Sequence, residues 1–175
     1  MALRFEEIVS EDLYNACWRY CCRLSSSRQD AEDLLQEALV RAYLALGQLK
    51  DAERTKGWLF SIIRRAHIDR LRSRHSRPKT IADGSGVDPA ADRQPDPKPG
   101  PAGKSSALEA ALVSLPRQQR ELIELYHLEG LSLEETAQAL GIRVGAVKQR
   151  LLRAREALKR RLAPAFDAGE LEELF

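Results

Sequence analysis

The sequence has no apolar run long enough to cross a membrane, and its start, MALRFEEIVSEDLY, carries acids where a signal peptide needs apolar residues. We therefore expect a cytoplasmic protein. Cysteine is scarce, and the odd set of Cys17, Cys21 and Cys22 lies within one predicted helix. We interpret these three as reduced thiols, some of them packed in the core. A metal or redox site built on Cys17, Cys21 and His67 is the sharper alternative, although no CxxC pair elsewhere would complete a zinc site.

The sequence also lacks a catalytic constellation. Its three histidines, His67, His75 and His127, are scattered. The segment GIRVG does not follow a predicted strand, so it is not a nucleotide-binding loop. The carboxylates of the EDLLQE run share one predicted helix, and no second acidic cluster completes an acid–base pair or a metal cage. We therefore predict that the protein is not an enzyme, and we assign it no cofactor and no metal ligand.

Charge is unevenly distributed behind a net value of only +2. Residues 64–79 hold seven Lys or Arg against one acid, and residues 143–161 hold eight against one. The acids lie elsewhere, including the stretch between these two segments. Two basic stretches separated by an acidic one indicate two nucleic-acid contact surfaces, although two solvated helix faces would give the same composition.

Strand-like alternation is absent from the sequence, which predicts an all-α fold. Residues 76–104 differ from the rest in holding six prolines and four glycines and almost no apolar side chains. Such a segment cannot bury enough surface to offset its ordering entropy, so we predict a flexible acidic linker. It divides the chain into helical domains at 1–75 and 105–163. An acidic tail at 164–175 follows, either as a frayed end or as a short docking helix.

Apolar periodicity predicts the helices of both domains. In the first domain we expect helices at 10–24, starting at Ser10, at 29–47, ending at Gly47, and at 58–74. The inward faces of the latter two are predicted as Ala31, Leu34, Leu35, Ala38, Leu39, Ala42, Tyr43 and Leu46, and as Trp58, Leu59, Ile62, Ile63, Ala66 and Leu71. After the linker we expect helices at 105–114 and 117–129, the second with Leu122, Ile123, Leu125, Tyr126 and Leu128 as its core.

Residues 132–155, SLEETAQALGIRVGAVKQRLLRAR, predict a helix, a tight turn at Gly141 and a second, basic helix. Ser132 and Glu135 stand at the positions of a capping box. The apolar residues recur at helical spacing, as Leu133, Ala137 and Leu140 in the first helix and as Val147, Leu151, Ala154 and Leu158 in the second. This is the layout of a helix-turn-helix that places its second helix in the DNA major groove.

Three motifs in order carry a family resemblance: DAEDLLQEALVRAYLAL, then GWLFSIIRRAHIDRLRSR, then, across the linker, LPRQQRELIELYHLEGLSLEETAQALGIRVGAVKQRLLRAREALKRRL. The chain resembles the extracytoplasmic-function (ECF) sigma factors of the sigma-70 family. These are compact bacterial initiation factors with only sigma domains two and four. No single motif is unique, but the order of all three across a Pro/Gly linker is highly specific.

The resemblance implies a surface that docks on the β′ clamp helices of core RNA polymerase. It consists of Asp33, Leu34, Gln36 and Glu37. Asp33, Gln36 and Glu37 are spaced so that they share one face of a helix. A solvated helix face would show the same spacing.

The resemblance also implies recognition and opening of the minus-ten promoter element by the first domain. Cations suited to contacting an opened strand occur in the predicted polar loop 50–57 and on the helix that follows it, at Lys50, Arg54, Lys56, Arg64, Arg65, Arg70 and Arg72. Asp69 is interpreted as a brace for neighbouring arginines. Trp58 is interpreted as a core residue, with base stacking as the alternative.

The second domain is implied to read the minus-thirty-five element. Base and phosphate contacts are expected from Arg143, Lys148, Gln149, Arg150, Leu152 and Arg153. Arg143 stands where the family often has Ser or Pro, which predicts a weaker helix cap.

The partners implied by the resemblance are core polymerase (the β′ clamp helices and the β flap), promoter DNA and an anti-sigma factor, possibly membrane-bound. No small-molecule substrate is expected. The linker would thread the polymerase cleft or act as a passive tether. Two rival functions remain open: a free-standing helix-turn-helix regulator, and a thiol or metal sensor built on the three cysteines.

Overall fold

The computed structural model describes residues 5–49, 51–76 and 104–174. Within these ranges every regular element is a helix, which confirms the all-α prediction. The chain forms two compact units, residues 1–96 and 97–175. Most of the predicted linker and Lys50 lie outside the described residues. Ser76 and Lys104, which the sequence placed in the linker, are the last residue of one helix and the first of the next.

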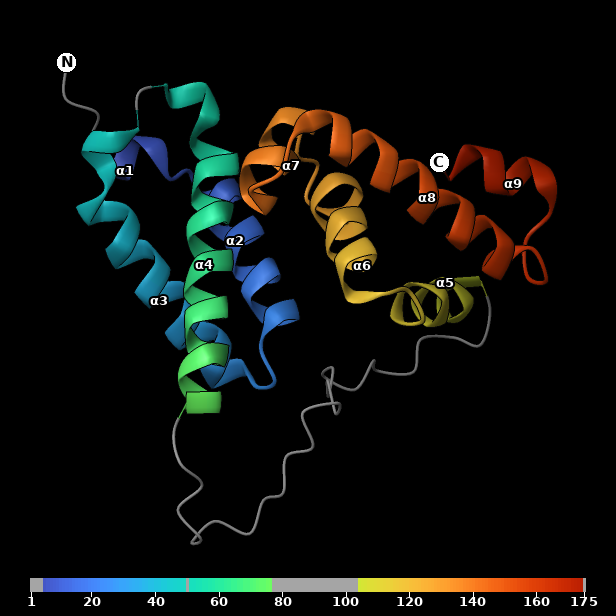
Figure 1. The fold of residues 1–175 in the computed structure, drawn as a ribbon, viewed down its shortest axis with the longest axis horizontal. Helices are drawn as coiled ribbons and strands as arrows, with labels where there is room; N and C mark the ends of the chain where they lie inside the picture. Colours follow the sequence, from blue (N-terminus) through green and yellow to red (C-terminus); the bar gives the residue numbers. More distant parts are fainter. Residues whose placement is uncertain (1–4, 50, 77–103, 175) are drawn as a thin grey trace, which may run out of the picture. The chain divides into compact units, whose positions relative to one another are not determined.

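Unit 1 is a small bundle in which α2, α3 and α4 pack on one another (Figure 1). Its elements are α1 Phe5–Ile8, α2 Glu11–Leu24, α3 Arg28–Leu44, η1 Leu46–Gln48, η2 Ala52–Arg54 and α4 Thr55–Ser76. Serine side chains cap the N-termini of α2 and α3. Ser10 Oγ accepts the Leu13 amide at 3.3 Å, and Ser27 Oγ accepts the Asp30 amide at 3.1 Å. The predicted start at Ser10 is confirmed.

The end of α3 differs from the prediction. The helix stops at Leu44, and the chain tightens into the 3₁₀ turn η1, so Gly47 is not its terminator. The amide of Ala45 donates to the carbonyls of Arg41 and Tyr43, which closes the helix three residues earlier than expected. Gly47 therefore does not adopt the left-handed conformation that makes glycine useful at a helix end.

The core of unit 1 is built on an aromatic pair that the sequence did not single out. The rings of Tyr20 and Phe60 lie 5.1 Å apart between centroids, and both residues are fully buried. Most of the predicted core is confirmed, with Leu34, Leu59 and Ile63 among the buried residues. Tyr43 was wrongly predicted to face inward.

Tyr43 is 64% exposed, and its ring meets that of Phe5 edge-on at 5.7 Å. The fully buried Ala38 and Ala42 mark the inward face of α3 at this point. Each residue turns the helix by about 100°, so the position after Ala42 points away from that face.

The three cysteines are free thiols on α2. Cys17 and Cys21 are buried and Cys22 is partly exposed, which confirms the prediction of reduced, largely core cysteines. Burial raises the pKa of the Cys21 thiol to about 12, which makes it a poor nucleophile. In the part of the chain that the structure describes, no three His, Cys, Asp or Glu side chains come together as a metal site. None of the described helices is long and apolar enough to span a bilayer.

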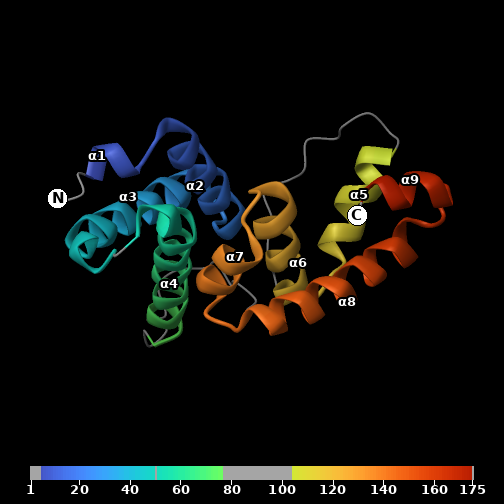
Figure 2. The same cartoon turned by 90° about the horizontal axis from the view of Figure 1, so that it is seen from above.

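Unit 2 consists of α5 and α6, a π-helical turn, the pair α7–α8 and a terminal helix α9 (Figure 2). The bounds are α5 Lys104–Val113, α6 Arg117–Ile123, η3 Glu124–Leu128, α7 Leu133–Leu140, α8 Val144–Leu162 and α9 Ala168–Glu173. The predicted helix at 117–129 is thus divided. Glu129 donates its amide to the carbonyl of Glu124 at 2.9 Å, five residues back, which widens the last turn.

This wide turn shifts the helical phase, so Leu128 is 54% exposed instead of buried as predicted. Gly130 then ends the segment in a left-handed conformation with φ 62°, as glycine commonly does after a helix. The core of the unit lies between α5, α6, α7 and α8 and is covered at one end by α9. Its buried members include Ala111, Leu122, Ile123, Ala137, Val147, Leu151, Ala154, Leu158, Leu162 and Leu171.

Candidate functional site

The pair α7–α8 has the local geometry of a helix-turn-helix. Glu135 donates its amide to Ser132 Oγ at 3.1 Å, and Ser132 donates its amide to Glu135 Oε2 at 2.7 Å, so the predicted capping box is present. Gly141 ends α7 with φ 67°, in the left-handed region that costs glycine no strain. The Ile142 amide then donates to the carbonyl of Ala137 at 3.0 Å. These local bonds set the angle at which α8 leaves the turn.

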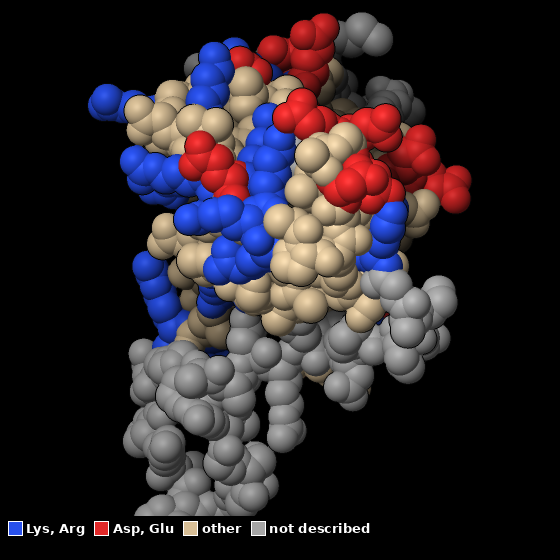
Figure 3. Space-filling view, turned by 90° about the vertical axis from the view of Figure 1, so that its right-hand side faces the viewer, with Lys and Arg blue, Asp and Glu red and all other residues tan. Residues whose placement is uncertain are grey.

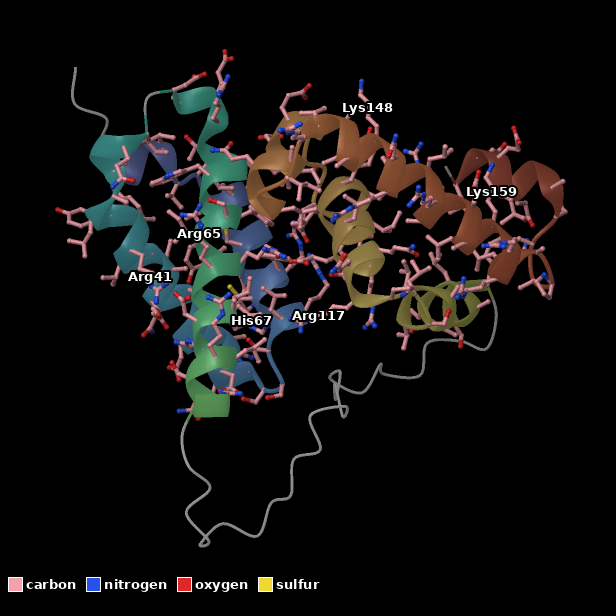
Figure 4. The ribbon with its side chains drawn as sticks, viewed as in Figure 1. Arg41, Arg65, His67, Arg117, Lys148 and Lys159 are labelled. Carbon is pink, nitrogen blue, oxygen red and sulfur yellow. The ribbon has the colours of Figure 1, made fainter. Side chains whose placement is uncertain are left out.

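The two faces of α8 separate apolar from basic side chains. Val147, Leu151, Ala154 and Leu158 are buried, as the spacing predicted. The opposite face is exposed and consists of Lys148, Gln149, Arg150, Leu152 and Arg153. Figure 4 shows Lys148 pointing away from the helices. A row of cations and an amide on one exposed helix face supplies the donors that base edges and phosphates require.

Arg143 is the N-cap residue of α8, and its side chain makes no capping hydrogen bond. An arginine has no acceptor with which to satisfy the free amides of a first helical turn. Its exposed guanidinium adds positive charge at a helix end that already favours anions. This end of α8 is therefore suited to a phosphate group.

Arg155 was not among the residues expected to contact DNA. In the structure its side chain turns toward two aromatic residues of η3. Its Nε lies 3.3 Å from His127 Nε2, and its guanidinium stacks 5.7 Å from the centre of the Tyr126 ring. Arg155 thus ties α8 to η3. Partial burial, and then the charge of Arg155, lower the pKa of His127, which favours the neutral imidazole that can accept this bond.

The residues expected to dock on polymerase do not share one environment. Asp33 and Gln36 are exposed on α3, whereas Leu34 is 1% exposed and belongs to the core of unit 1. Glu37 is partly buried and bonded to two arginines. Its Oε1 lies 2.6 Å from Arg41, and its Oε2 lies 2.6 Å from Arg70 on α4. Only Asp33 and Gln36 of the expected four are therefore open to a partner.

Further pairs extend this network between α3 and α4. Arg41 donates to Asp69 Oδ2 at 2.7 Å, and Arg74 donates to Asp30 Oδ1 at 3.1 Å. Hydrogen bonding to Asp69 raises the pKa of Arg41. Burial opposes the ionisation of Asp30, but hydrogen bonds from Ser26 and the charge of Arg74 outweigh it and lower its pKa. Asp69 therefore braces an arginine, as expected, but one on α3.

A second exposed feature of α3 was missed by the sequence analysis. Val40 is 59% exposed and Leu44 is 78% exposed. Asp33 and Gln36 are three residues apart, and Val40 and Leu44 follow at intervals of four residues. All four side chains therefore lie on one face of the helix. We name Asp33, Gln36, Val40 and Leu44 the outer face of α3. The signal was the continuation of the same spacing from Gln36 to Val40 and Leu44, two apolar residues that the predicted inward face of this helix did not include.

The cations expected at the minus-ten element also differ in their surroundings. Arg65 and Arg72 are exposed on α4, and Arg54 is exposed but lies 3.6 Å from Asp51. Lys56 and Arg64 are partly buried, and Arg70 is held by Glu37. Lys50 lies outside the described residues. Trp58 is partly buried, so it is neither a fully buried core residue nor a fully exposed surface for base stacking.

Charge is unevenly distributed on the face of the molecule drawn in Figure 3, where most Lys and Arg side chains lie at the left and centre and most Asp and Glu side chains lie at the upper right. The acids at the C-terminal end include Asp167, Glu170, Glu172 and Glu173. The cations at the end of α8 are Lys159, Arg160 and Arg161. A nucleic acid would favour only the cationic area.

The chain matches two protein families. Residues 10–77 match Sigma-70 region 2, and residues 105–158 match Sigma-70, region 4. The two matches fall on units 1 and 2 respectively. The helix-turn-helix of α7 and α8 lies almost entirely within the second match.

Several similar proteins are ECF RNA polymerase sigma factors. The ECF RNA polymerase sigma factor SigF of Caulobacter vibrioides is 38% identical, over 82% of this chain and 76% of its own length. SigW of Bacillus subtilis is 30% identical, over 90% of this chain and 88% of its own length. SigE of Mycolicibacterium smegmatis is 33% identical over 91% of this chain. The chain spans 62% of the length of that SigE and 35% of the Xanthomonas campestris protein RfaY, a probable RNA polymerase sigma factor.

Two solved structures resemble this one. One is the sigma factor RpoE of Bartonella quintana in complex with the anti-sigma factor NepR. It has a TM-score of 0.61 and 28% identity, over 86% of this chain and 92% of that chain. The other is CnrH in complex with the cytosolic domain of CnrY, with a TM-score of 0.59 and 25% identity, over 93% and 89% of the two chains.

Proposed function

Because the chain belongs to the ECF sigma factors of the sigma-70 family, we propose that it directs core RNA polymerase to specific promoters and opens them for transcription. The observation that carries this proposal is the exposed row of Lys148, Gln149 and Arg153 on the second helix of a helix-turn-helix whose first helix has a capping box and ends at a left-handed Gly141. Unit 1, which matches region 2, adds a second domain for docking on polymerase, and a simple DNA-binding regulator would not need such a domain. Polymerase performs the phosphodiester chemistry, so the chain itself is not an enzyme.

Unit 2 reads the minus-thirty-five element through α8. Lys148, Gln149 and Arg153 contact base edges, and the exposed Leu152 packs against a thymine methyl group. Arg143 and Arg150 hold phosphates on either side and so fix the register of the helix in the groove. The buried face of α8, anchored by Val147 and Leu151, keeps this row rigid.

The outer face of α3 docks on core polymerase. Asp33 and Gln36 supply the polar contacts, and Val40 and Leu44 extend them with exposed apolar area. An interface with a polar part beside an exposed apolar part is typical of protein–protein contacts. Leu34 contributes from the core by fixing α3 on α4, and Glu37 is largely engaged with arginines of this chain.

Unit 1 contacts the opened minus-ten strand through its exposed cations. Arg54, Arg65 and Arg72 are open to a phosphate backbone, with Lys56 and Arg64 partly buried beside them. Figure 4 labels Arg65 on α4. Single strands are held by cations along the backbone and by aromatic faces for bases. Trp58 is partly exposed and suits the second task. Arg70 serves as a brace within unit 1.

The wider setting follows from these contacts. The protein works in the cytoplasm, where polymerase and promoters are found. Residues 1–75 form sigma domain two and residues 105–163 sigma domain four, with 76–104 between them. An anti-sigma factor holds the protein inactive until a signal arrives. This is supported by the solved structure of the similar sigma factor RpoE, which is bound to the anti-sigma factor NepR.

Run-off transcription with purified core polymerase tests the proposal. The templates are DNA fragments from upstream of the protein's own gene, with and without added protein. A new, defined transcript that requires the protein supports the proposal. Absence of both a transcript and co-purification with core polymerase, together with a footprint on duplex DNA by the protein alone, would favour the free-standing regulator.

A further inference from the structure

The helix α9 belongs to unit 2 but lies beyond the segment that matches region 4. It carries its own start signal. The Glu170 amide donates to Asp167 Oδ1 at 2.9 Å, and the Asp167 amide donates to Glu170 Oε2 at 3.1 Å. Such a capping box satisfies two backbone amides at the start of the helix that would otherwise lack a partner. Figures 1 and 2 both show α9 beside the second half of α8.

Two apolar side chains anchor this segment to unit 2. Leu171 is 9% exposed and belongs to the core cluster, and Phe166, in the turn before α9, packs against the same cluster. The other face of α9 is exposed and acidic, with Glu172 and Glu173. The helix is therefore amphipathic, with a single buried leucine as its anchor.

Two lysines from different helices flank the anchor. The ammonium group of Lys104, the first residue of α5, pairs with Glu170 and lies 5.5 Å from the centre of the Phe166 ring. Lys159 Nζ, on α8, lies 3.7 Å from Glu172 Oε1. Figure 4 labels Lys159 on the part of α8 next to α9. The surface under α9 thus has an apolar floor and a cationic rim.

The contacts that hold α9 are few. The buried Leu171, the packing of Phe166 and two ion pairs with partly exposed side chains must offset the entropy lost by ordering the whole segment. Because few contacts oppose this loss of entropy, we expect α9 to be held weakly. A helix with the same pattern and additional anchors would displace it.

We propose that the surface under α9 is a docking site for an acidic amphipathic helix of a partner protein. In this structure α9 occupies the site and competes with that partner. The chemistry of the partner follows from the occupant: a leucine anchor for the apolar floor and carboxylates for Lys104 and Lys159. This site is separate from the DNA-reading face of α8, which lies on the first half of that helix.

The test uses the full chain with α9 loosened by Leu171→Ser. The probe is a fluorophore-labelled peptide of residues 164–175, and binding is followed by anisotropy. The variant should bind the peptide roughly tenfold more tightly than the unaltered chain, whose own α9 competes at high effective concentration. Leu174→Ser, at the C-cap of α9 where the side chain is 38% exposed, is the matched control and should bind as weakly as the unaltered chain. If Leu171→Ser disturbs folding, Glu170→Gln with Glu172→Gln loosens α9 while keeping the leucine.

Three further arms decide the chemistry. A peptide with serine in place of Leu171 should not bind, and Lys104→Glu with Lys159→Glu in the host should weaken binding about tenfold. An acidic helical peptide of different sequence, with the Asp-x-x-Glu cap and one leucine kept in place, should bind within about threefold of the tail peptide. Equal binding by the Leu171→Ser and Leu174→Ser chains, or binding by the natural tail alone, would overturn the proposal. So would a dimer of the unaltered chain that Leu171→Ser abolishes, because the occupant would then be a second copy.

Discussion

Arg70 Nε lies 2.6 Å from Glu37 Oε2, across 33 positions of sequence, and joins α4 to α3 in unit 1. Arg70 also donates to the carbonyl of Asp30 at 3.3 Å. Family resemblance assigns Glu37 to polymerase and Arg70 to DNA, yet the fold pairs them. We infer that the first role of this pair is to fix α4 on α3, which sets where the exposed Arg65 and Arg72 stand.

The pair should contribute measurably to the stability of unit 1. Both side chains are about 30% exposed (28% and 31%), so a double-mutant cycle of Glu37→Gln and Arg70→Gln should give a coupling free energy of about 1 kcal/mol. Urea unfolding followed by tryptophan fluorescence measures this, because Trp18 and Trp58 both lie in unit 1. The exposed Arg28–Glu32 pair is the control and should give less than about 0.5 kcal/mol. Equal couplings for the two pairs would contradict the bracing role.

Bracing and DNA contact can be separated at two neighbouring arginines. Arg72→Gln removes an exposed cation and should lower promoter opening, measured by permanganate reactivity, without changing the unfolding midpoint of unit 1. Arg70→Gln should lower the midpoint first, because it removes the partner of Glu37. A normal midpoint with strongly reduced opening in Arg70→Gln would restore Arg70 to the DNA surface.

The outer face of α3 should determine affinity for core polymerase. Asp33→Ala with Leu44→Ala should weaken core binding roughly tenfold, because it removes a polar and an apolar contact while leaving the core of unit 1 intact. Binding is measured by fluorescence titration with purified core. Glu32→Gln, on an exposed part of the same helix, is the matched control. Core affinity unchanged in the double variant would remove this face from the interface.

Arg153 should matter for promoter choice and not for core binding. Arg153→Ala should reduce transcription from the cognate promoter roughly tenfold, since a base contact by arginine contributes about 1–3 kcal/mol of discrimination. Arg160→Ala, two helical turns further along α8, also removes an exposed cation and should have little effect. Parallel losses of core binding and transcription in Arg153→Ala would contradict the assignment.

Gly141 and Gly145 form a matched pair for testing the turn. An alanine Cβ would meet nothing within 4 Å at either position, but only Gly141 has a positive φ, 67°. Gly141→Ala should therefore destabilise unit 2 by about 1 kcal/mol through backbone strain alone. Gly145→Ala, within α8, should stabilise it by up to about 1 kcal/mol. Circular dichroism gives both values, with tryptophan fluorescence marking the transition of unit 1. Equal effects at the two positions would contradict this account of the turn.

The His127–Arg155 contact predicts a pH dependence. Burial and the charge of Arg155 lower the pKa of His127, so the folded unit binds this proton less readily than the unfolded chain. Unit 2 should then lose stability as the pH falls through the ordinary value of 6.5, and the loss should level off below the folded pKa. An NMR titration of His127 measures that pKa, and Arg155→Met should raise it. Titration of His127 at or above 6.5 in the unaltered chain would contradict the prediction.

The sequence by itself determined the all-helical fold, the cap at Ser10, the capping box of Ser132 and Glu135, and the turn at Gly141. These features depend on residues three to five positions apart, so the pattern of the chain carries them. The buried row of α8 was predictable for the same reason.

Only the tertiary structure decided which of the charged residues are open to a partner. Arg70 and Arg72 look alike in sequence, but one meets Glu37 from another helix and the other meets solvent. The exposure of Leu128 could not be predicted from apolar periodicity either, because a single wide turn shifts the helical phase. The docking of Leu171 depends on a floor built by helices distant in sequence. Contacts between distant segments depend on how the helices pack, and local periodicity does not encode that packing.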